Sequence, residues 1–154
     1  LISWMMRSLL NIAKNFSKVK MTEVEAAYIA GLFDGEGSIT YKKYYERKKK
    51  GNKVNRYKCW RIVMEISMTD KFIIEWVHSV VGCGTVRKKP RKGGHKMQYR
   101  WRCSFRDAFH VCCLLFPYAQ VKLDKISNII DHYTPDNPIP SNVIDLKKYR
   151  ELHK

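Results

Sequence analysis

The chain has 154 residues, enough for one domain with a buried core and too few for two independent ones. Its formal charge of +16 far exceeds what solubility requires and indicates a polyanionic partner, for which nucleic acid is the first candidate. The 45% of apolar residues exclude a largely disordered chain, and no apolar run approaches the roughly 20 residues of a membrane span, so we expect a globular protein without a membrane partner.

Two features of the sequence indicate where in the cell the protein is expected: its first 21 residues and its cysteines. Residues 1–21 mix apolar and basic side chains without an acid, which predicts a basic amphipathic extension, either a transit peptide or an extra helix packed on the domain. The five cysteines form no C-x-x-C pair, so we expect buried reduced thiols, with a zinc site as the alternative. An intracellular protein of an organelle or a prokaryotic cytoplasm is expected, and not a secreted one.

The periodicity of apolar residues predicts the elements in chain order. A capping box at Thr22 and Glu25 starts the first helix, and Gly35 and Gly37 are expected to end it. The predicted elements are a helix over 23–34, strands over 38–48 and 55–68 around Gly51 and Asn52, a helix over 70–81 capped by Thr69, strands over 84–91 and 96–105 around Gly93 and Gly94, and helices over 106–116 and 121–133.

This order predicts an α+β domain over residues 22–133, with a four-stranded antiparallel sheet and helices on one face. Alternation gives each strand a core face, and the middle helix an apolar side. The predicted core-facing residues are Trp60, Ile62, Met64, Ile66, Met97, Tyr99, Trp101, Cys103 and Phe105 in the strands and Phe72, Ile73, Trp76, Val77 and Val80 in the helix. Residues 134–154 hold three prolines and predict a tail with a short helix.

The end of the first helix has an unusual composition. Ala27, Gly31 and Gly35 recur every four residues and form a bare stripe, along which another backbone can approach closely. Asp34 and Glu36 place two acids where the helix ends. In so basic a chain, two converging acids suggest metal ions held against phosphate.

The positive charge is concentrated in the two predicted hairpins. Residues 42–61 and 87–102 hold 18 of the 30 Lys and Arg residues and a single acid, Glu46. A solvated charged face is the simpler interpretation, but the charge is one-sided and alternates with tyrosines. Two-stranded ribbons fit the major groove of DNA, so we expect the polar sheet face to bind it.

Residues 29–37, Ile-Ala-Gly-Leu-Phe-Asp-Gly-Glu-Gly, followed by Ser38 and Ile39, resemble the LAGLIDADG signature of homing endonucleases and maturases. The resemblance extends over residues 22–133 and implies the αββαββα fold of that family, with the sheet as a DNA-binding saddle. The motif occurs once. Single-motif members are homodimers whose motif helices cross at a two-fold axis, which implies an interface at Ala27, Ala30, Gly31, Asp34 and Gly35.

The resemblance also implies site residues. Glu36 matches the motif acid that ligates the catalytic metals, where the family commonly has Asp, and Gly35 matches the position whose carbonyl reaches metal. Asp34 is expected to brace the helix end. Lys122 matches a basic residue near the cleaved phosphate, and Ser67 and Lys71 are candidates for a water-positioning role that the family often gives to Gln at the position of Met68. The alternatives are a structural cap for Glu36 and surface lysines for Lys71 and Lys122.

We therefore expect a homodimeric endonuclease that cleaves a long pseudo-palindromic duplex site with Mg²⁺ or Mn²⁺, whereas Ca²⁺ is expected to bind without supporting cleavage. The alternative is an RNA-binding intron maturase or a non-catalytic DNA-binding protein. The predicted DNA-binding residues are the outward side chains of the strands: Thr40, Lys42, Tyr44, Glu46, Lys48, Arg61, Glu65, Arg87, Lys89, Arg91, Gln98, Arg100 and Arg102.

Overall fold

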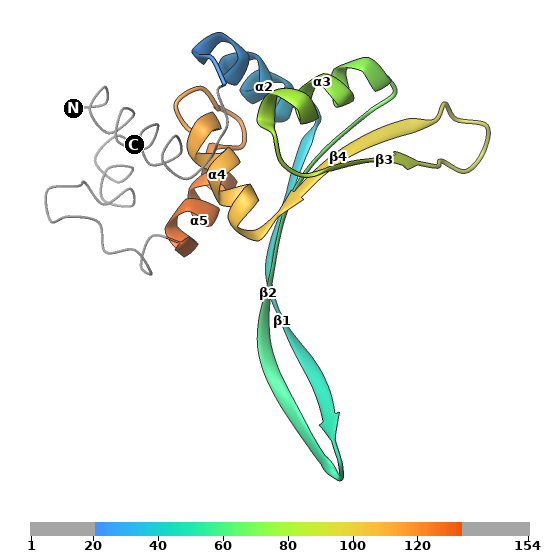
Figure 1. Cartoon of the computed structure of the whole chain (residues 1–154), viewed down its shortest axis with the longest axis vertical. Helices are drawn as coiled ribbons and strands as arrows, with labels where there is room; N and C mark the ends of the chain where they lie inside the picture. The colour runs from blue at the N-terminus through green and yellow to red at the C-terminus, as the bar shows by residue number, and fades with distance from the viewer. Residues whose placement is uncertain (1–20, 134–154) are drawn as a thin grey trace, which may run out of the picture.

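The computed structural model describes residues 21–133, so the predicted N-terminal extension and C-terminal tail lie outside the described residues. Figure 1 shows the order of the elements and the long hairpin that leaves the body of the domain. The elements are α2 (Glu23–Glu36), β1 (Gly37–Lys50), β2 (Lys53–Met68), α3 (Lys71–Val81), β3 (Thr85–Lys89), β4 (Gln98–Ser104), α4 (Phe105–Leu115) and α5 (Leu123–Tyr133).

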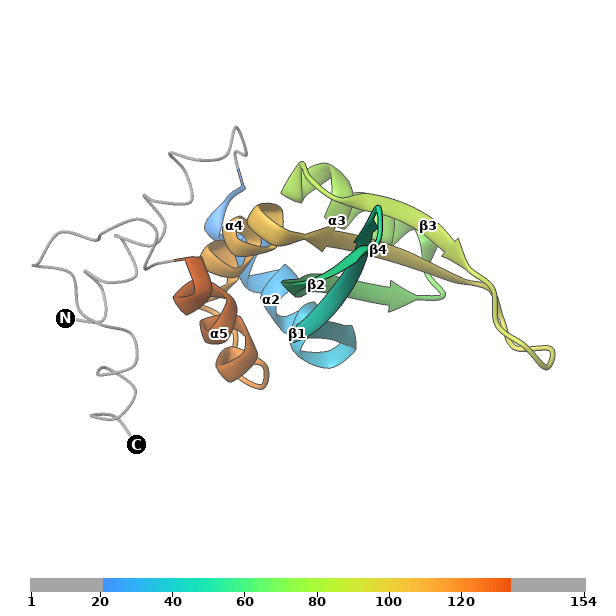
Figure 2. The ribbon, with the colours of Figure 1, turned by 90° about the horizontal axis from the view of Figure 1, so that it is seen from below.

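The strands form one antiparallel sheet in the order β1-β2-β4-β3. The two hairpins meet where β2 pairs with β4, from Val63 opposite Ser104 to Met68 opposite Tyr99. The helices gather on one side of the sheet, and the β3–β4 hairpin extends away from them in Figure 2, as the β1–β2 hairpin does in Figure 1. The predicted α+β fold with its αββαββα order is confirmed.

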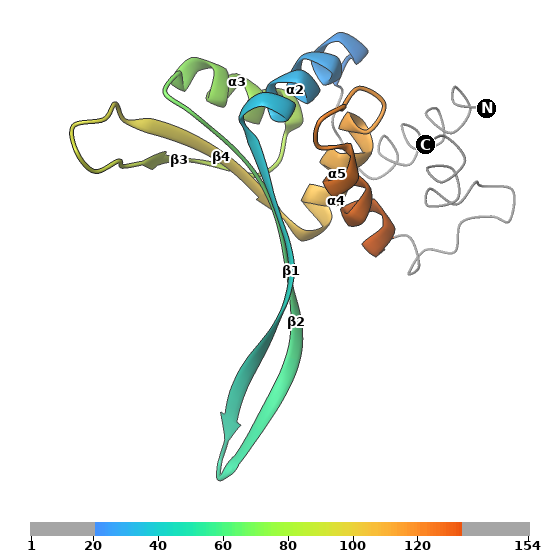
Figure 3. The ribbon, with the colours of Figure 1, turned by 180° about the vertical axis from the view of Figure 1, so that it is seen from behind.

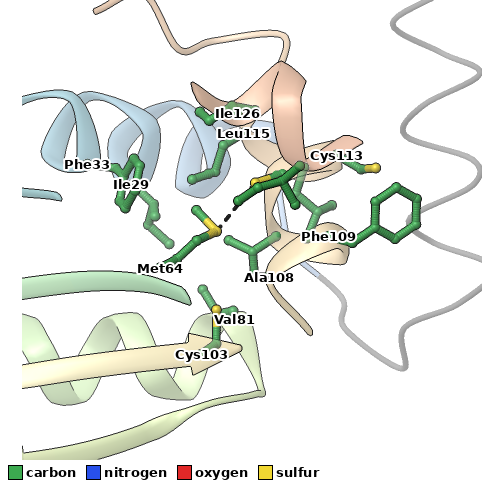
Figure 4. Close-up of a cluster of buried hydrophobic side chains, with 14 of the residues drawn as sticks. Ile29, Phe33, Met64, Val81, Cys103, Ala108, Phe109, Cys113, Leu115 and Ile126 are labelled. Atoms are coloured by element: carbon green, nitrogen blue, oxygen red, sulfur yellow. Dashed lines mark hydrogen bonds between the residues drawn. The ribbon is translucent and has the colours of Figure 1, made fainter. Parts of the chain in front are cut away.

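The core lies between the sheet and the helices (Figure 4). Ile62, Met64 and Ile66 of β2 are fully buried, as the alternation of that strand predicts, and Trp101 of β4 is buried beside them. Met64 reaches the thiol of Cys112 on α4, at 3.4 Å between the sulfur atoms. Burial of these large side chains, at about 1.5–3 kcal/mol each, holds the helices to the sheet.

The first helix continues two residues beyond its predicted end, through Gly35 to Glu36. The capping box is present as predicted, with the Thr22 hydroxyl accepting from the Glu25 amide at 3.2 Å. The helix ends at Gly37, whose backbone is extended with φ −81° and ψ 157°. This position admits no side chain, because an added Cβ would lie 2.3 Å from the ring of Phe33. The extension places the Glu36 carboxylate in the last turn of α2.

The second hairpin has shorter strands than predicted. β3 ends at Lys89, because Pro90 has no amide to donate to the ladder, and Arg91 therefore lies in the loop. Met97 precedes β4 and is 42% exposed. Phe105 was predicted to end the strand on the core face, but it begins α4 with a φ of 54° and is 53% exposed.

The middle helix is shifted and rotated from its prediction. Its N-cap is Asp70, whose side chain accepts from the Ile73 amide at 3.2 Å, and not Thr69. Ile74, Val77 and Val81 form the buried side, whereas Phe72 is 73% exposed. The apolar residues of α3 cover more than one face of the helix, so the sequence does not show which of them pack against the sheet.

The five cysteines, Cys59, Cys83, Cys103, Cys112 and Cys113, are free thiols, and the last three are buried. Burial raises the pKa of the Cys113 thiol to about 12, so this sulfur stays protonated. No described helix is long and apolar enough to cross a membrane.

Candidate functional site

The C-terminal end of α2 is joined to the loop before α5 by Asp34. The two carboxylate oxygens accept from the backbone amides of Gln120, at 2.8 Å, and Lys122, at 3.0 Å. Burial raises the pKa of this carboxyl, but the amides of Gln120, Lys122 and Val121 outweigh that effect and lower the pKa. Asp34 is therefore ionised and braces the helix end, as predicted from its position in the motif.

The same loop brings Lys122 to the end of α2. Its ammonium donates to the backbone carbonyl oxygen of Asp34, one of the last-turn carbonyls that the helix cannot satisfy itself. The ammonium also lies 5.9 Å from the centre of the Phe33 ring. A cation at the negative end of a helix dipole is favourable, so Lys122 is held against Asp34 at the end of α2 and is not a freely solvated surface lysine.

Glu36 and Gly35 are exposed at this end of α2. Within residues 21–133, the Glu36 carboxylate has no hydrogen bond or ion pair, and no three His, Cys, Asp or Glu side chains gather into a metal-binding group. A carboxylate and a backbone carbonyl are oxygen ligands of the kind that Mg²⁺ prefers, and the helix C-terminus favours a cation. The two residues therefore have the chemistry to supply part of the ligands of a divalent cation.

An apolar stripe on α2 faces away from the core. Ala27, Gly31 and Gly35 are exposed, and neighbouring Val24 and Tyr28 are 80% and 53% exposed. A Cβ added at Gly31 or Gly35 would meet nothing within 4 Å, so the bare stripe is open.

The predicted place of Ala30 in the dimer interface is wrong. Ala30 is fully buried in the core of its own chain, because it lies beside Ile29 and Phe33 on the inner side of the helix. The carboxylate of Asp34 is likewise engaged within its own chain.

The structure separates Ser67 and Lys71, the two candidates for a water-positioning role. The Ser67 hydroxyl donates to the Glu65 carboxylate at 3.0 Å on the polar sheet face. Lys71 pairs with Glu75 at 3.4 Å and lies over the ring of Tyr99, whose side of the sheet carries the helices. Neither makes a described contact with Glu36 or Lys122, whereas Lys122 reaches the motif helix directly.

The strand register places nearly all predicted DNA-binding residues on one side of the sheet, called here the front face. Lys42 is opposite Arg61, Glu65 is opposite Arg102, and Arg102 is opposite Thr85. Arg87, Lys89, Gln98 and Arg100 share this face by the same alternation. Arg91 lies in the loop beyond β3, so its predicted place on the strand is wrong.

Glu65 is the centre of an ionic cluster on the front face. Its carboxylate accepts from Arg102 at 2.7 and 3.0 Å and from Lys89 at 3.2 Å, and it lies 3.8 Å from Arg100. Burial raises the pKa of Glu65, but bonds from Arg102, Lys89 and Ser67 outweigh it and lower the pKa. The sequence predicted that Glu65 contacts DNA but did not predict that its carboxylate binds cations of β3 and β4. The cluster depends on the β2–β4 register, which the sequence does not show.

Along the free part of the first hairpin, front-face cations lie beside tyrosines. Arg61 lies 5.5 Å from the ring centre of Tyr44, and Lys48 lies 5.9 Å from that of Tyr57. Both rings are exposed, and such pairs hold a long cationic side chain extended at a surface. The front face thus presents oriented cations over both hairpins.

Comparisons with known proteins agree with this architecture. A family profile described as LAGLIDADG endonuclease matches residues 29–118. The fold is similar to that of the homing endonuclease I-CvuI in complex with the I-CreI target, at 21% identity, a TM-score of 0.53 and coverage of 71% of this chain and 65% of that one. It is also similar to the archaeal intron-encoded homing endonuclease I-Vdi141I complexed with DNA, at 17% identity, a TM-score of 0.55 and coverage of 71% and 66%.

A third similar structure is the homing endonuclease I-TnaI, at 19% identity, a TM-score of 0.53 and coverage of 69% of each chain. This chain therefore spans just under two thirds of the length of the first two structures. A search of curated proteins finds no match. At these identities the structural likeness establishes the fold alone.

Proposed function

The chain belongs to the LAGLIDADG endonuclease family, and from this premise we propose that it is a site-specific DNA endonuclease, active as a homodimer with divalent metal ions. The proposal rests on the arrangement of side chains at the C-terminal end of α2. There an unpaired, exposed carboxylate, Glu36, lies in the same helix turn as Asp34, whose carbonyl holds the Lys122 ammonium. Carboxylate and cation together suit phosphodiester hydrolysis.

The substrate is a long duplex. The front face carries cations over both hairpins, and β1 alone has 14 residues, or about 48 Å at the rise of an antiparallel strand. The similar structures I-CvuI and I-Vdi141I are described in complex with DNA. Two chains related by a two-fold axis would cover a pseudo-palindromic site of about two such lengths.

Dimerisation through α2 accounts for its exposed stripe. Gly31 and Gly35 have open space where a side chain would be, at a cost of about 1 kcal/mol each relative to alanine in a helix. A second copy of α2 against this stripe would bring the two Glu36 carboxylates close to one axis. The active site then forms only when two chains meet.

In the catalytic site Glu36 and the Gly35 carbonyl would hold the metal, Mg²⁺ or Mn²⁺, which when bound supplies charge stabilisation and activates water. Ca²⁺ is expected to bind without supporting cleavage. Lys122 is placed to offset charge that develops on the phosphate. Asp34 holds the Lys122 backbone, so it positions this cation and does not ligate the metal.

The test is cleavage of the DNA into which the gene is inserted. Purified protein is incubated with a duplex made of the rejoined flanks of its reading frame, with Mg²⁺, Mn²⁺ or Ca²⁺. We expect a double-strand break with the first two ions and binding without cleavage with the third. Intact DNA under all conditions, together with tight binding to the intron RNA, would instead support the RNA-binding alternative.

A further inference from the structure

The β1–β2 hairpin has a second exposed face. The hairpin leaves the body of the domain (Figure 3). The side chains at positions 42–58 are exposed on both sides of the ribbon. The side opposite the front face is called here the back face. It consists of Lys43, Tyr45, Arg47, Lys49, Val54, Arg56 and Lys58.

The back face carries five cations and no acid, because Glu46, the one acid of this hairpin, lies on the front. Lys43 and Lys58 are close enough that the Lys58 ammonium lowers the pKa of Lys43. Arg47 and Arg56 are directly opposite each other in the strand register. Like charges arranged in this way repel one another in the free protein and are relieved by an anion that they share.

Aromatic side chains order these cations. The Arg56 guanidinium lies 4.6 Å from the ring centre of Tyr45, and the Lys43 ammonium lies 4.9 Å from that of Trp60. At the base of the hairpin the Tyr41 and Trp60 rings stack at 4.8 Å, and His132 of α5 contacts both, at 3.3 Å from the Tyr41 hydroxyl. The base of the hairpin is thus anchored to the body of the domain.

The dimensions of the major groove show where the back face would lie. Side chains on one face of a sheet occupy about 5 Å, half the roughly 10 Å between packed sheets. A ribbon whose front side chains reach the base edges therefore has its backbone about 5 Å above the floor of a groove about 8.5 Å deep. The back-face side chains then begin about 3.5 Å below the rim and, at an extent of about 5 Å, reach past it to the level of the phosphates of both strands.

We infer that the back face of the β1–β2 hairpin is a second phosphate-binding surface, which contacts the DNA backbone on the two walls of the groove while the front face meets the base edges. The inference rests on duplex DNA being the partner, as proposed above. It adds contacts outside the front face that raise affinity for any duplex without reading sequence.

The experiment compares two double variants of the full chain that lose equal charge. Arg47→Gln with Lys58→Gln changes the back face, whereas Arg106→Gln with Lys125→Gln changes α4 and α5, away from the sheet. The dissociation constant for a mixed-sequence duplex is measured over a range of salt concentrations. Since each phosphate contact contributes about 0.9 to the slope of log K against log salt, we expect the back-face variant to lose up to about 1.8 per bound chain and the control to keep its slope.

An equal slope for the two variants, with both folded by circular dichroism, would overturn the inference. A back-face variant that weakens binding to single-stranded RNA alone and keeps the duplex slope would also overturn it, by assigning this surface to RNA. Binding to a mixed-sequence duplex requires neither cleavage nor a known target. A protein that cuts no DNA, which would contradict the proposed endonuclease, therefore still gives a result on the back face.

Discussion

Replacing Glu65 with Gln removes the one negative charge that organises the cations of the front face. The carboxylate has direct bonds from Arg102 and Lys89 and lies 3.8 Å from Arg100, and its side chain is only 12% exposed. The amide keeps the shape but carries no charge and offers one oxygen. Three cations on adjacent strands are then left without their counter-ion.

The size of the effect follows from burial. Hydrogen bonds to charged groups contribute about 1.5–3 kcal/mol, and removal of one partner of a buried ion pair costs about 3–5 kcal/mol. The cations are 24–43% exposed, so solvent screens part of their repulsion. We therefore expect Glu65→Gln to lower the free energy of unfolding by about 2–3 kcal/mol.

Glu75→Gln is the matched control, because it makes the same change in an exposed pair. Glu75 and its partner Lys71 are 54% and 57% exposed, and such a pair contributes no more than about 0.5 kcal/mol. Urea unfolding at neutral pH measures both variants. Equal losses for the two would refute the assignment of Glu65 as the centre of the cluster.

The pH dependence gives a second measurement on the same residue. The pKa of Glu65 is lower in the folded protein than its ordinary value, so its contribution to stability is present above about pH 4.3 and is lost as the pH falls through the folded-state pKa. The stability difference between the native protein and Glu65→Gln should therefore shrink in acid. A difference that stays constant down to pH 3 would contradict this reasoning.

Three further substitutions test the geometry of α2. Gly31→Ala should raise the free energy of unfolding of one chain by up to about 1 kcal/mol, because its Cβ meets nothing, yet weaken self-association in sedimentation; unchanged association would exclude the stripe as the dimer contact. Gly37→Ala should lower stability by about 2 kcal/mol in thermal unfolding, because its Cβ collides with Phe33, and an unaltered melting temperature would contradict that. Asp34→Asn should cost about 1–2 kcal/mol by losing one of its two backbone bonds and should slow cleavage more than it weakens DNA binding; a purely structural role would leave the rate per bound complex unchanged.

Patterns local in sequence predicted most of the fold. The capping box of Thr22 and Glu25 fixed the start of α2, and the alternation of β2 identified Ile62, Met64 and Ile66 as core residues. The motif also placed Asp34 correctly as a brace. These features depend on residues within a few positions of one another, which periodicity and capping rules describe directly.

The errors concern contacts between segments far apart in the chain. Ala30 was assigned to a dimer interface, although its side of the helix faces the core, and Phe72 was assigned to the core but is exposed. The ionic cluster around Glu65 was not predicted, because nothing local shows that Arg102 pairs opposite it; its predicted DNA contact stays a prediction. The periodicity of apolar residues shows which residues of a strand share a face. It does not show the register between β2 and β4, which depends on how the two hairpins join.

Cleavage by Glu36→Gln most directly tests the claim that this carboxylate holds the catalytic metal. The variant and a matched control, Glu23→Gln at the exposed opposite end of α2, are compared with the native protein on the same duplex site in Mg²⁺. We expect Glu36→Gln to bind the duplex but to cleave it at least about 10³-fold more slowly, since loss of several kcal/mol of charge stabilisation corresponds to that factor, and Glu23→Gln to cleave normally. Cleavage at the native rate by Glu36→Gln would show that this carboxylate does not hold the catalytic metal.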